Sequence, residues 1–165
     1  MRRSAVQPSG RDFGLRSRVR PRQDSRDDER LARWIARVDG DMGVGSTIQV
    51  VFTSTWTGHL RIEACDAPRH LLLTTEPGTD DEGQIEAWLT EEGAKTRLVV
   101  EERGLPMTHL PFHASGWRVH LEDLGRSLGV AGPVHPEGWS SEAGAPGWQR
   151  RWEELTPTYQ QAEIG

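Results

Sequence analysis

Residues 112–128, FHASGWRVHLEDLGRSL, carry the clearest structural pattern in this chain. Its large apolar side chains recur at steps of four, three and four residues, which is the spacing of one face of an α-helix. These residues are Trp117, Leu121, Leu124 and Leu128. Gly129 follows the last of them, and glycine readily adopts the left-handed conformation that ends many helices. We therefore predict an amphipathic helix that packs its apolar face on a flat apolar surface.

That surface is predicted from residues 46–103, where the apolar period changes to two. Five segments of about five to nine residues alternate apolar and polar side chains, and short turns join them. This pattern predicts an antiparallel meander of five strands with one apolar face. The helix and the meander together predict an α+β fold, with any binding or catalytic site lying between the two.

The segment before the sheet is predicted to form a short helix. Asp27 and Asp28 are favourable helix N-caps, and the helix is expected to run through Arg37. Its apolar face would contain Leu31, Trp34 and Ile35.

The segment after the long helix begins with residues 129–147, which are rich in Gly, Pro and Ser and are predicted to form a loop. A final helix is predicted to begin near Trp148. Pro157 is expected to break or kink that helix, because proline lacks the backbone N–H donor.

The chain divides into a basic tail and one domain. Residues 1–26 contain eight arginines and two aspartates, a net charge of +6, and they lack the apolar periodicity of a helix or a strand. Such a composition is typical of a disordered segment. We predict a disordered basic tail over residues 1–26 and one domain over residues 27–165.

Charge and cysteine content limit the function classes. The whole chain has a net charge of −5, so the part after the tail carries −11. An acidic domain binds nucleic acid poorly, so we expect no nucleic-acid partner. Cys65 is the single cysteine, which excludes an internal disulfide and is typical of a reducing compartment such as the cytoplasm. No apolar run has the length of a membrane span.

Several local motifs resemble those of a known superfamily. They are ERLARW (29–34), DAPRHL (66–71), LTEEGAKTRL (89–98), GWRVHLEDL (116–124) and RWEELTPTY (151–159). Together they resemble the START-related (SRPBCC, helix-grip) superfamily, and within it the bacterial branch named after the activator of heat-shock protein 90 ATPase. The resemblance covers about residues 27–161. It implies a curved antiparallel sheet wrapped around a long C-terminal helix, with an apolar cavity between them that holds lipids, polyketides or other hydrophobic molecules.

One part of the family pattern is not found in the sequence. Members of the superfamily begin with a strand and a helix, whereas residues 1–26 have no strand pattern and no apolar periodicity. Without that strand, an edge of the sheet would be exposed, and exposed edges pair with other chains. We therefore expect either a natural truncation that forms a homodimer through this edge or is marginally stable, or a misread or frameshifted start of the reading frame.

Two histidines and one glutamate are the candidates for acid–base chemistry. His113 and His120 lie seven residues apart on one flank of the long helix and are expected to face the cavity. Glu102 continues the inward register of the last strand, so its carboxylate is expected to approach Trp117 or His113. Ordinary structural roles, with the histidine tips in water or a slip in the strand register, are the alternatives for all three.

Metal and thiol chemistry are not expected. His109 and His113 have the spacing of a metal-binding pair, but Pro111 lies between them and no third ligand is apparent. We predict no metal and no cofactor. Cys65 ends a strand on its polar face, where nothing nearby in the sequence would favour a reactive thiolate.

The leading functional hypothesis is a module that binds an apolar or amphipathic small molecule between the sheet and the helix. The residues predicted to contact this ligand are Trp117, Leu121, His113, Leu60, Ile62, Leu73, Leu89, Leu98 and Val100. A second hypothesis is a cyclase- or dehydratase-like enzyme that uses His113, His120 or Glu102 as acid or base. A third is a protein-interaction or chaperone-related module that docks a partner through the open sheet edge or the basic tail.

Overall fold

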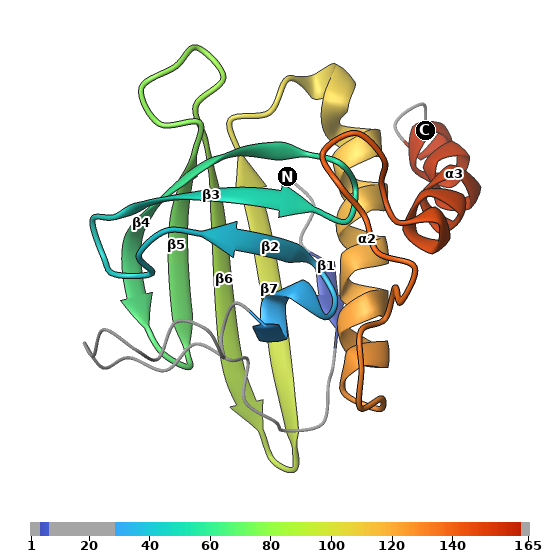
Figure 1. Cartoon of the computed structure of the whole chain (residues 1–165), viewed down its shortest axis with the longest axis horizontal. Helices are drawn as coiled ribbons and strands as arrows, with labels where there is room; N and C mark the ends of the chain where they lie inside the picture. The colour runs from blue at the N-terminus through green and yellow to red at the C-terminus, as the bar shows by residue number, and fades with distance from the viewer. Residues whose placement is uncertain (1–3, 7–28, 163–165) are drawn as a thin grey trace.

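The computed structural model describes residues 4–6 and 29–162, which form a single antiparallel sheet and two long helices (Figure 1). The order of strands across the sheet is β1-β7-β6-β5-β4-β3-β2, so all strands after β1 pair with their neighbours in the sequence. The strands are β1 (Ser4–Val6), β2 (Ala36–Asp39), β3 (Thr47–Phe52), β4 (Thr57–Asp66), β5 (His70–Thr75), β6 (Gly83–Glu92) and β7 (Lys95–Arg103). The helices are η1 (Met107–His109), α2 (Leu110–Ser127) and α3 (Pro146–Gln161).

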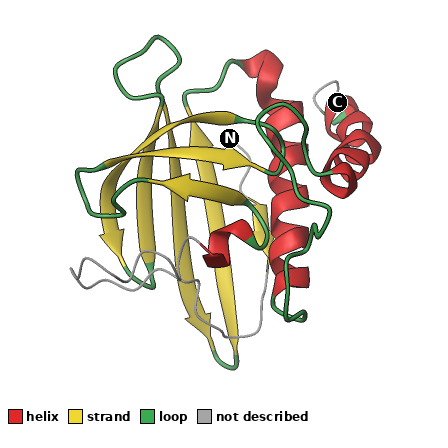
Figure 2. Cartoon of the chain, viewed as in Figure 1, coloured by secondary structure: helices red, strands yellow, loops and turns green. Residues whose placement is uncertain are grey.

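The sheet curves around α2, and α3 packs on the side of α2 that faces away from the sheet (Figures 1 and 2). This arrangement is the α+β helix-grip fold. The predicted meander over residues 46–103 is confirmed as β3 to β7, and the predicted long helix is confirmed as α2. The alternation of apolar and polar residues was sufficient for this prediction because each strand buries one face only.

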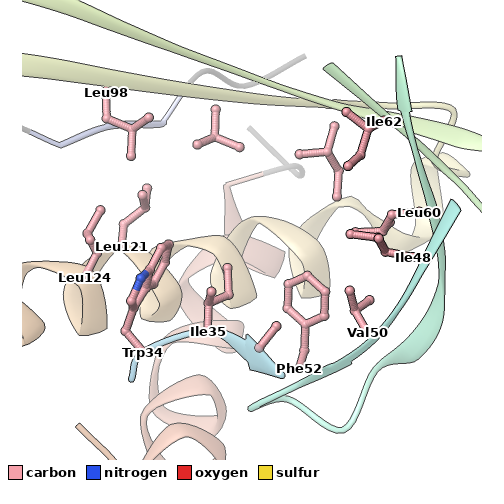
Figure 3. Packing of buried hydrophobic residues seen from close by; sticks show 13 residues of the cluster. Trp34, Ile35, Ile48, Val50, Phe52, Leu60, Ile62, Leu98, Leu121 and Leu124 are labelled. Atoms are coloured by element: carbon pink, nitrogen blue, oxygen red, sulfur yellow. The ribbon is translucent and has the colours of Figure 1, made fainter. Parts of the chain in front are cut away.

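Two apolar cores lie on opposite sides of α2. Leu121 and Leu124 face the sheet and belong to the larger core, whose side chains converge from β2, β3, β4, β6 and β7 (Figure 3). On its other side α2 buries Val119 against Trp148 of α3 and Trp139 of the loop before it. Helix α2 is therefore buried on two sides rather than on one stripe, which a single apolar face in the sequence does not indicate.

The predicted helix over residues 27–37 is wrong in its second half. The helical turn spans residues 29–32, a turn follows, and Ala36–Asp39 forms β2 against β3. The backbone N–H of Thr53 also donates to the carbonyl of Ile35 at 2.8 Å. The stripe of apolar residues in this segment is equally compatible with a turn that enters a strand, and tertiary pairing with β3 selects the strand. The proposed caps Asp27 and Asp28 lie outside the described residues.

The expectation that no strand precedes residue 27 is wrong for residues 4–6. Strand β1 pairs with β7 in antiparallel register, with Ser4 opposite Val100 and Val6 opposite Leu98. Three residues are too short to show a periodicity in the sequence, and pairing along β7 supplies the order instead. The predicted disorder of residues 7–26 falls outside the described residues.

A β-bulge in β4 changes which face its last residues occupy. The pairing of β4 with β5 shifts register between Ile62 and Ala64, and Cys65 then lies opposite Leu71, an inward residue. Because side chains alternate with a period of two, one extra residue moves all later side chains to the other face. The prediction that Cys65 lies on the polar face is therefore wrong, and its thiol borders the interior.

The C-terminal part of the chain differs from the prediction at one proline. Helix α3 continues past Pro157 to Gln161, so the expected break does not occur. Near this position the Thr156 hydroxyl donates to the Trp152 carbonyl at 2.7 Å and lies 2.9 Å from the Ser115 hydroxyl of α2. The contact with Ser115 joins the second half of α3 to α2.

Candidate functional site

A cavity of about 150 Å³ lies between the concave face of the sheet and α2. Its wall is made of side chains from β2 to β7, from the helical turn at residues 29–32, and from one face of α2. Figure 3 shows several of these side chains converging, among them Ile48, Leu60, Ile62 and Leu98 from the sheet and Leu121 from the helix. The cavity wall is thus almost entirely aliphatic and aromatic.

Eight of the nine residues predicted to contact a ligand form part of this wall. They are Trp117, Leu121, Leu60, Ile62, Leu73, Leu89, Leu98 and Val100. The ninth, His113, does not line the cavity. Whether the eight contact a ligand stays a prediction.

The sequence reasoning missed the part of the wall that precedes β3. Trp34, Ile35 and Ala36 line the cavity, and so do Leu31 and Met42. The sequence pattern predicts a separate short helix and a loop for these residues, and it does not indicate that they lie opposite α2. An apolar stripe that ends just before the sheet was the signal that could have identified them.

The lining residues with ionisable side chains gather at one end of the cavity. They are Cys65, Arg69 and His70, in or beside the turn between β4 and β5. His70 Nε2 lies 2.8 Å from the Glu86 carboxylate on the neighbouring strand. Burial raises the pKa of the Cys65 thiol, which keeps it protonated near neutral pH.

Glu102, His113 and Trp117 form a hydrogen-bonded cluster beside the cavity. The Trp117 indole N–H donates to Glu102 Oε2 at 2.8 Å, and His113 Nδ1 lies 3.1 Å from the same oxygen. The structure therefore places Glu102 beside both residues that the strand register indicated. However, only Trp117 of the three lines the cavity, so its indole ring lies between the cavity and the Glu102–His113 pair.

His120 does not face the cavity, contrary to the expectation. Its ring is buried on the α3 side of α2, where Nδ1 accepts a hydrogen bond from the Trp148 indole N–H at 3.2 Å. The Thr53 hydroxyl lies 3.4 Å from the same nitrogen. Burial, together with the nearby His135, lowers the pKa of His120 to about 3. A neutral core histidine whose acceptor nitrogen is already occupied is poorly suited to acid–base chemistry in the cavity.

A second buried polar pair was not predicted. His135 Nε2 lies 2.6 Å from Asp123 Oδ2, and both side chains are almost fully buried. Asp123 also pairs with Arg126 one turn along α2. The pair ties the loop after α2 back onto the helix. Asp123 lies outside the apolar stripe of Trp117, Leu121, Leu124 and Leu128, so its burial follows from the second buried side of α2.

No metal site emerges from the described part of the chain, in which no three His, Cys, Asp or Glu side chains gather in a suitable cluster. His109 and His113 stack with their ring centroids 6.4 Å apart. Among the described residues, no helix has both the length and the apolar character needed to cross a bilayer.

The sequence matches the model of the family described as Activator of Hsp90 ATPase homolog 1-like protein, over residues 26–129. The chain belongs to this family. The matching region runs from the helical turn through β2 to the end of α2, and therefore includes the elements that enclose the cavity. Comparison with curated proteins finds no match.

Solved structures confirm the fold of this family member. CalU16 from Micromonospora echinospora is 23% identical with a TM-score of 0.59, and the match covers 82% of this chain and 73% of CalU16. DynU16, a protein in the dynemicin biosynthetic locus, is 20% identical with a TM-score of 0.63, covering 80% of this chain and 49% of DynU16. The protein encoded by gene BPP1335 from Bordetella parapertussis is 20% identical with a TM-score of 0.60, covering 96% and 84%. At these identities the likeness shows the shared helix-grip fold alone.

Proposed function

We propose that this protein binds a small apolar or amphipathic molecule in the cavity between the sheet and α2. The observation that supports the proposal is the cavity itself, which is enclosed by apolar side chains of the sheet and of α2. Protein interiors are normally packed to the density of organic crystals, so a void of this size is costly unless something occupies it.

The volume of the cavity limits the ligand. A dry apolar cavity of about 150 Å³ is large enough for benzene, whereas sites for drug-sized ligands enclose about 300–1,000 Å³. The cavity of this protein matches the smaller class. The ligand, or the part of it that enters, is therefore about one ring or a short acyl chain in size. A multi-ring molecule would require α2 or the β2–β3 region to move outward.

Binding of neutral one-ring aromatics such as benzene and toluene tests the proposal, with the quenching of tryptophan fluorescence as the readout. Trp34 and Trp117 line the cavity, so an occupant changes their emission. Ala87→Phe adds a ring to the inner face of β6 and should reduce binding at least tenfold. The matched control is Thr90→Phe, the same new side chain at an exposed position on β6, which should leave binding unchanged. Equal binding by the wild type and Ala87→Phe, or saturable binding of no probe, would contradict the proposal.

The cyclase- or dehydratase-like alternative rests on the Glu102–His113 pair. A carboxylate within 3.1 Å of an imidazole is a suitable acid–base arrangement. The indole of Trp117 separates this pair from the cavity, so direct proton transfer to a ligand requires that ring to rotate. The binding role needs no such movement, and for this reason we prefer it. A Glu102→Gln variant that retained binding and lost a turnover seen in the wild type would favour the enzyme.

The protein-interaction alternative and the homodimer stay predictions. Both were based on an edge of the sheet exposed by a missing first strand. Strand β1 pairs with part of that edge on β7, so one reason for expecting a partner chain is weaker. A location in the cytoplasm remains a proposal from the cysteine content.

A further inference from the structure

The ionisable residues of the cavity wall are confined to one end. Among the described lining residues, Cys65, Arg69 and His70 are the three with ionisable side chains, and all lie in or beside the turn between β4 and β5. The rest of the wall is made of apolar side chains and two indoles, and the N–H of one of these, Trp117, already donates to Glu102. A ligand with one polar group would therefore be oriented with that group toward the turn.

Two of these three side chains are less suited than Arg69 to recognise a charged group. His70 already has the Glu86 carboxylate as its partner at 2.8 Å. Burial raises the pKa of the Cys65 thiol, so it remains a neutral and weak hydrogen-bond donor. The remaining candidate at this end is the guanidinium of Arg69.

The backbone of Arg69 is fixed on both sides, whereas its side chain is exposed. Its N–H donates to the carbonyl of Asp66 at 2.7 Å, and its carbonyl accepts from the N–H of Leu89 at 2.8 Å. Within the described residues, no carboxylate forms an ion pair with its guanidinium, although Asp66 lies in the same turn and is also exposed. Most other described arginines of the sheet have such a partner, for example Arg61 with Glu63 and Arg103 with Glu86.

We propose that the cavity takes a small amphipathic carboxylate, with its apolar part between the sheet and α2 and its carboxylate at Arg69. This inference rests on the proposed function, because it names the ligand class for the same cavity. A guanidinium presents two parallel N–H donors that match the two oxygens of a carboxylate. One unpaired arginine balances one negative charge, so a monoanion fits this end of the cavity better than a dianionic phosphate.

The experiment compares two probes that differ only in the polar group, 3-phenylpropionate and 3-phenyl-1-propanol. Both carry one ring, the size that the cavity admits. Binding is measured by tryptophan quenching and by calorimetry at pH 7 and low salt. For a partly exposed charge-assisted pair, we expect wild-type protein to bind the acid roughly three- to tenfold more tightly than the alcohol. This preference should decrease as salt is added, because salt screens exposed charges.

Arg69→Gln should remove the preference for the acid and leave the affinity for the alcohol unchanged. The matched control is Arg150→Gln, an exposed arginine of α3 remote from the cavity wall, which should keep the wild-type preference. An equal affinity of the wild type for acid and alcohol would overturn the carboxylate proposal while leaving the binding function intact. A preference that survives Arg69→Gln would overturn the role of Arg69. If neither probe binds to the wild type, both the ligand class and the proposed function are wrong.

Discussion

The buried ring of His120 predicts a specific loss of stability in mild acid. Its pKa is lowered from 6.5 to about 3 in the folded protein, by burial first and by the nearby His135 second. The unfolded chain therefore binds a proton at this residue below about pH 6.5, while the folded chain does not until about pH 3. Stability is fully present above pH 6.5 and decreases as the pH falls, by about 1.4 kcal/mol for each pH unit in this window.

The magnitude between pH 7 and pH 5 follows from these two pKa values. His120 alone should lower the free energy of unfolding by about 2 kcal/mol over this range. Other groups titrate in the same window, so the effect must be isolated by a variant. His120→Asn removes the titrating ring, and its side-chain oxygen can still accept the hydrogen bond from the Trp148 indole N–H. The truncation itself costs stability, but that cost is nearly the same at both pH values.

Urea unfolding of the wild type and His120→Asn at pH 7 and pH 5 measures the difference. The wild type should lose about 2 kcal/mol more than the variant on acidification. His59→Asn, the same substitution at an exposed position of β4, is the control and should retain the wild-type loss. Equal losses in the wild type and His120→Asn would refute the reasoning, because they would mean that His120 takes up its proton in the folded protein as readily as in the unfolded chain.

Three further substitutions test the packing around the site by chemical denaturation. Gly104 has φ of +87°, and a Cβ there would lie 2.9 Å from the Cα of Gly83. Gly104→Ala should therefore lower the free energy of unfolding by roughly 1–3 kcal/mol. An unchanged free energy would show that the turn after β7 relaxes freely. Leu121 is 1% exposed and lines the cavity. Leu121→Ala should therefore lower the free energy of unfolding by roughly 2–5 kcal/mol and let the cavity bind larger probes. A loss under about 1 kcal/mol would mean that the enlarged cavity collapses. Asp123→Ala leaves the buried His135 without its carboxylate partner and should lower the free energy of unfolding by roughly 3–5 kcal/mol. An unchanged free energy of unfolding would mean that the pair is solvated.

The cavity wall was predictable where it depends on strand alternation. Leu60, Ile62, Leu98 and Val100 lie inward because a strand with one buried face must alternate, and this pattern is local in the sequence. The same alternation predicted that Glu102 points inward, and its carboxylate does lie beside Trp117. What the count could not show is that the Trp117 ring separates Glu102 from the cavity, because that depends on a rotamer set by packing.

The errors in the predicted site share another cause. Cys65 was placed on the polar face because the count along β4 assumed regular pairing, and the bulge after Ile62 is visible only in the register with β5. Arg69 lies in the turn between β4 and β5 and His70 is the first residue of β5, so neither belongs to a run of alternating residues long enough to indicate a face. The gathering of Cys65, Arg69 and His70 at one end of the cavity depends on how β4, β5 and α2 pack together.

Periodicity alone is enough to predict a long helix packed on an antiparallel meander, since the helical stripe around Leu121 and the alternation over residues 46–103 are local patterns that each require a covered apolar face. The resemblance to the superfamily added the curved sheet and the cavity. The tertiary structure decided what covers those faces. It showed that α2 is buried on two sides, which takes His120 into a core with Trp148 and away from the cavity. It also paired Ser4–Val6 with β7. The physical reason is that periodicity reports which side chains avoid water, whereas the identity of the neighbours depends on contacts between segments distant in the chain.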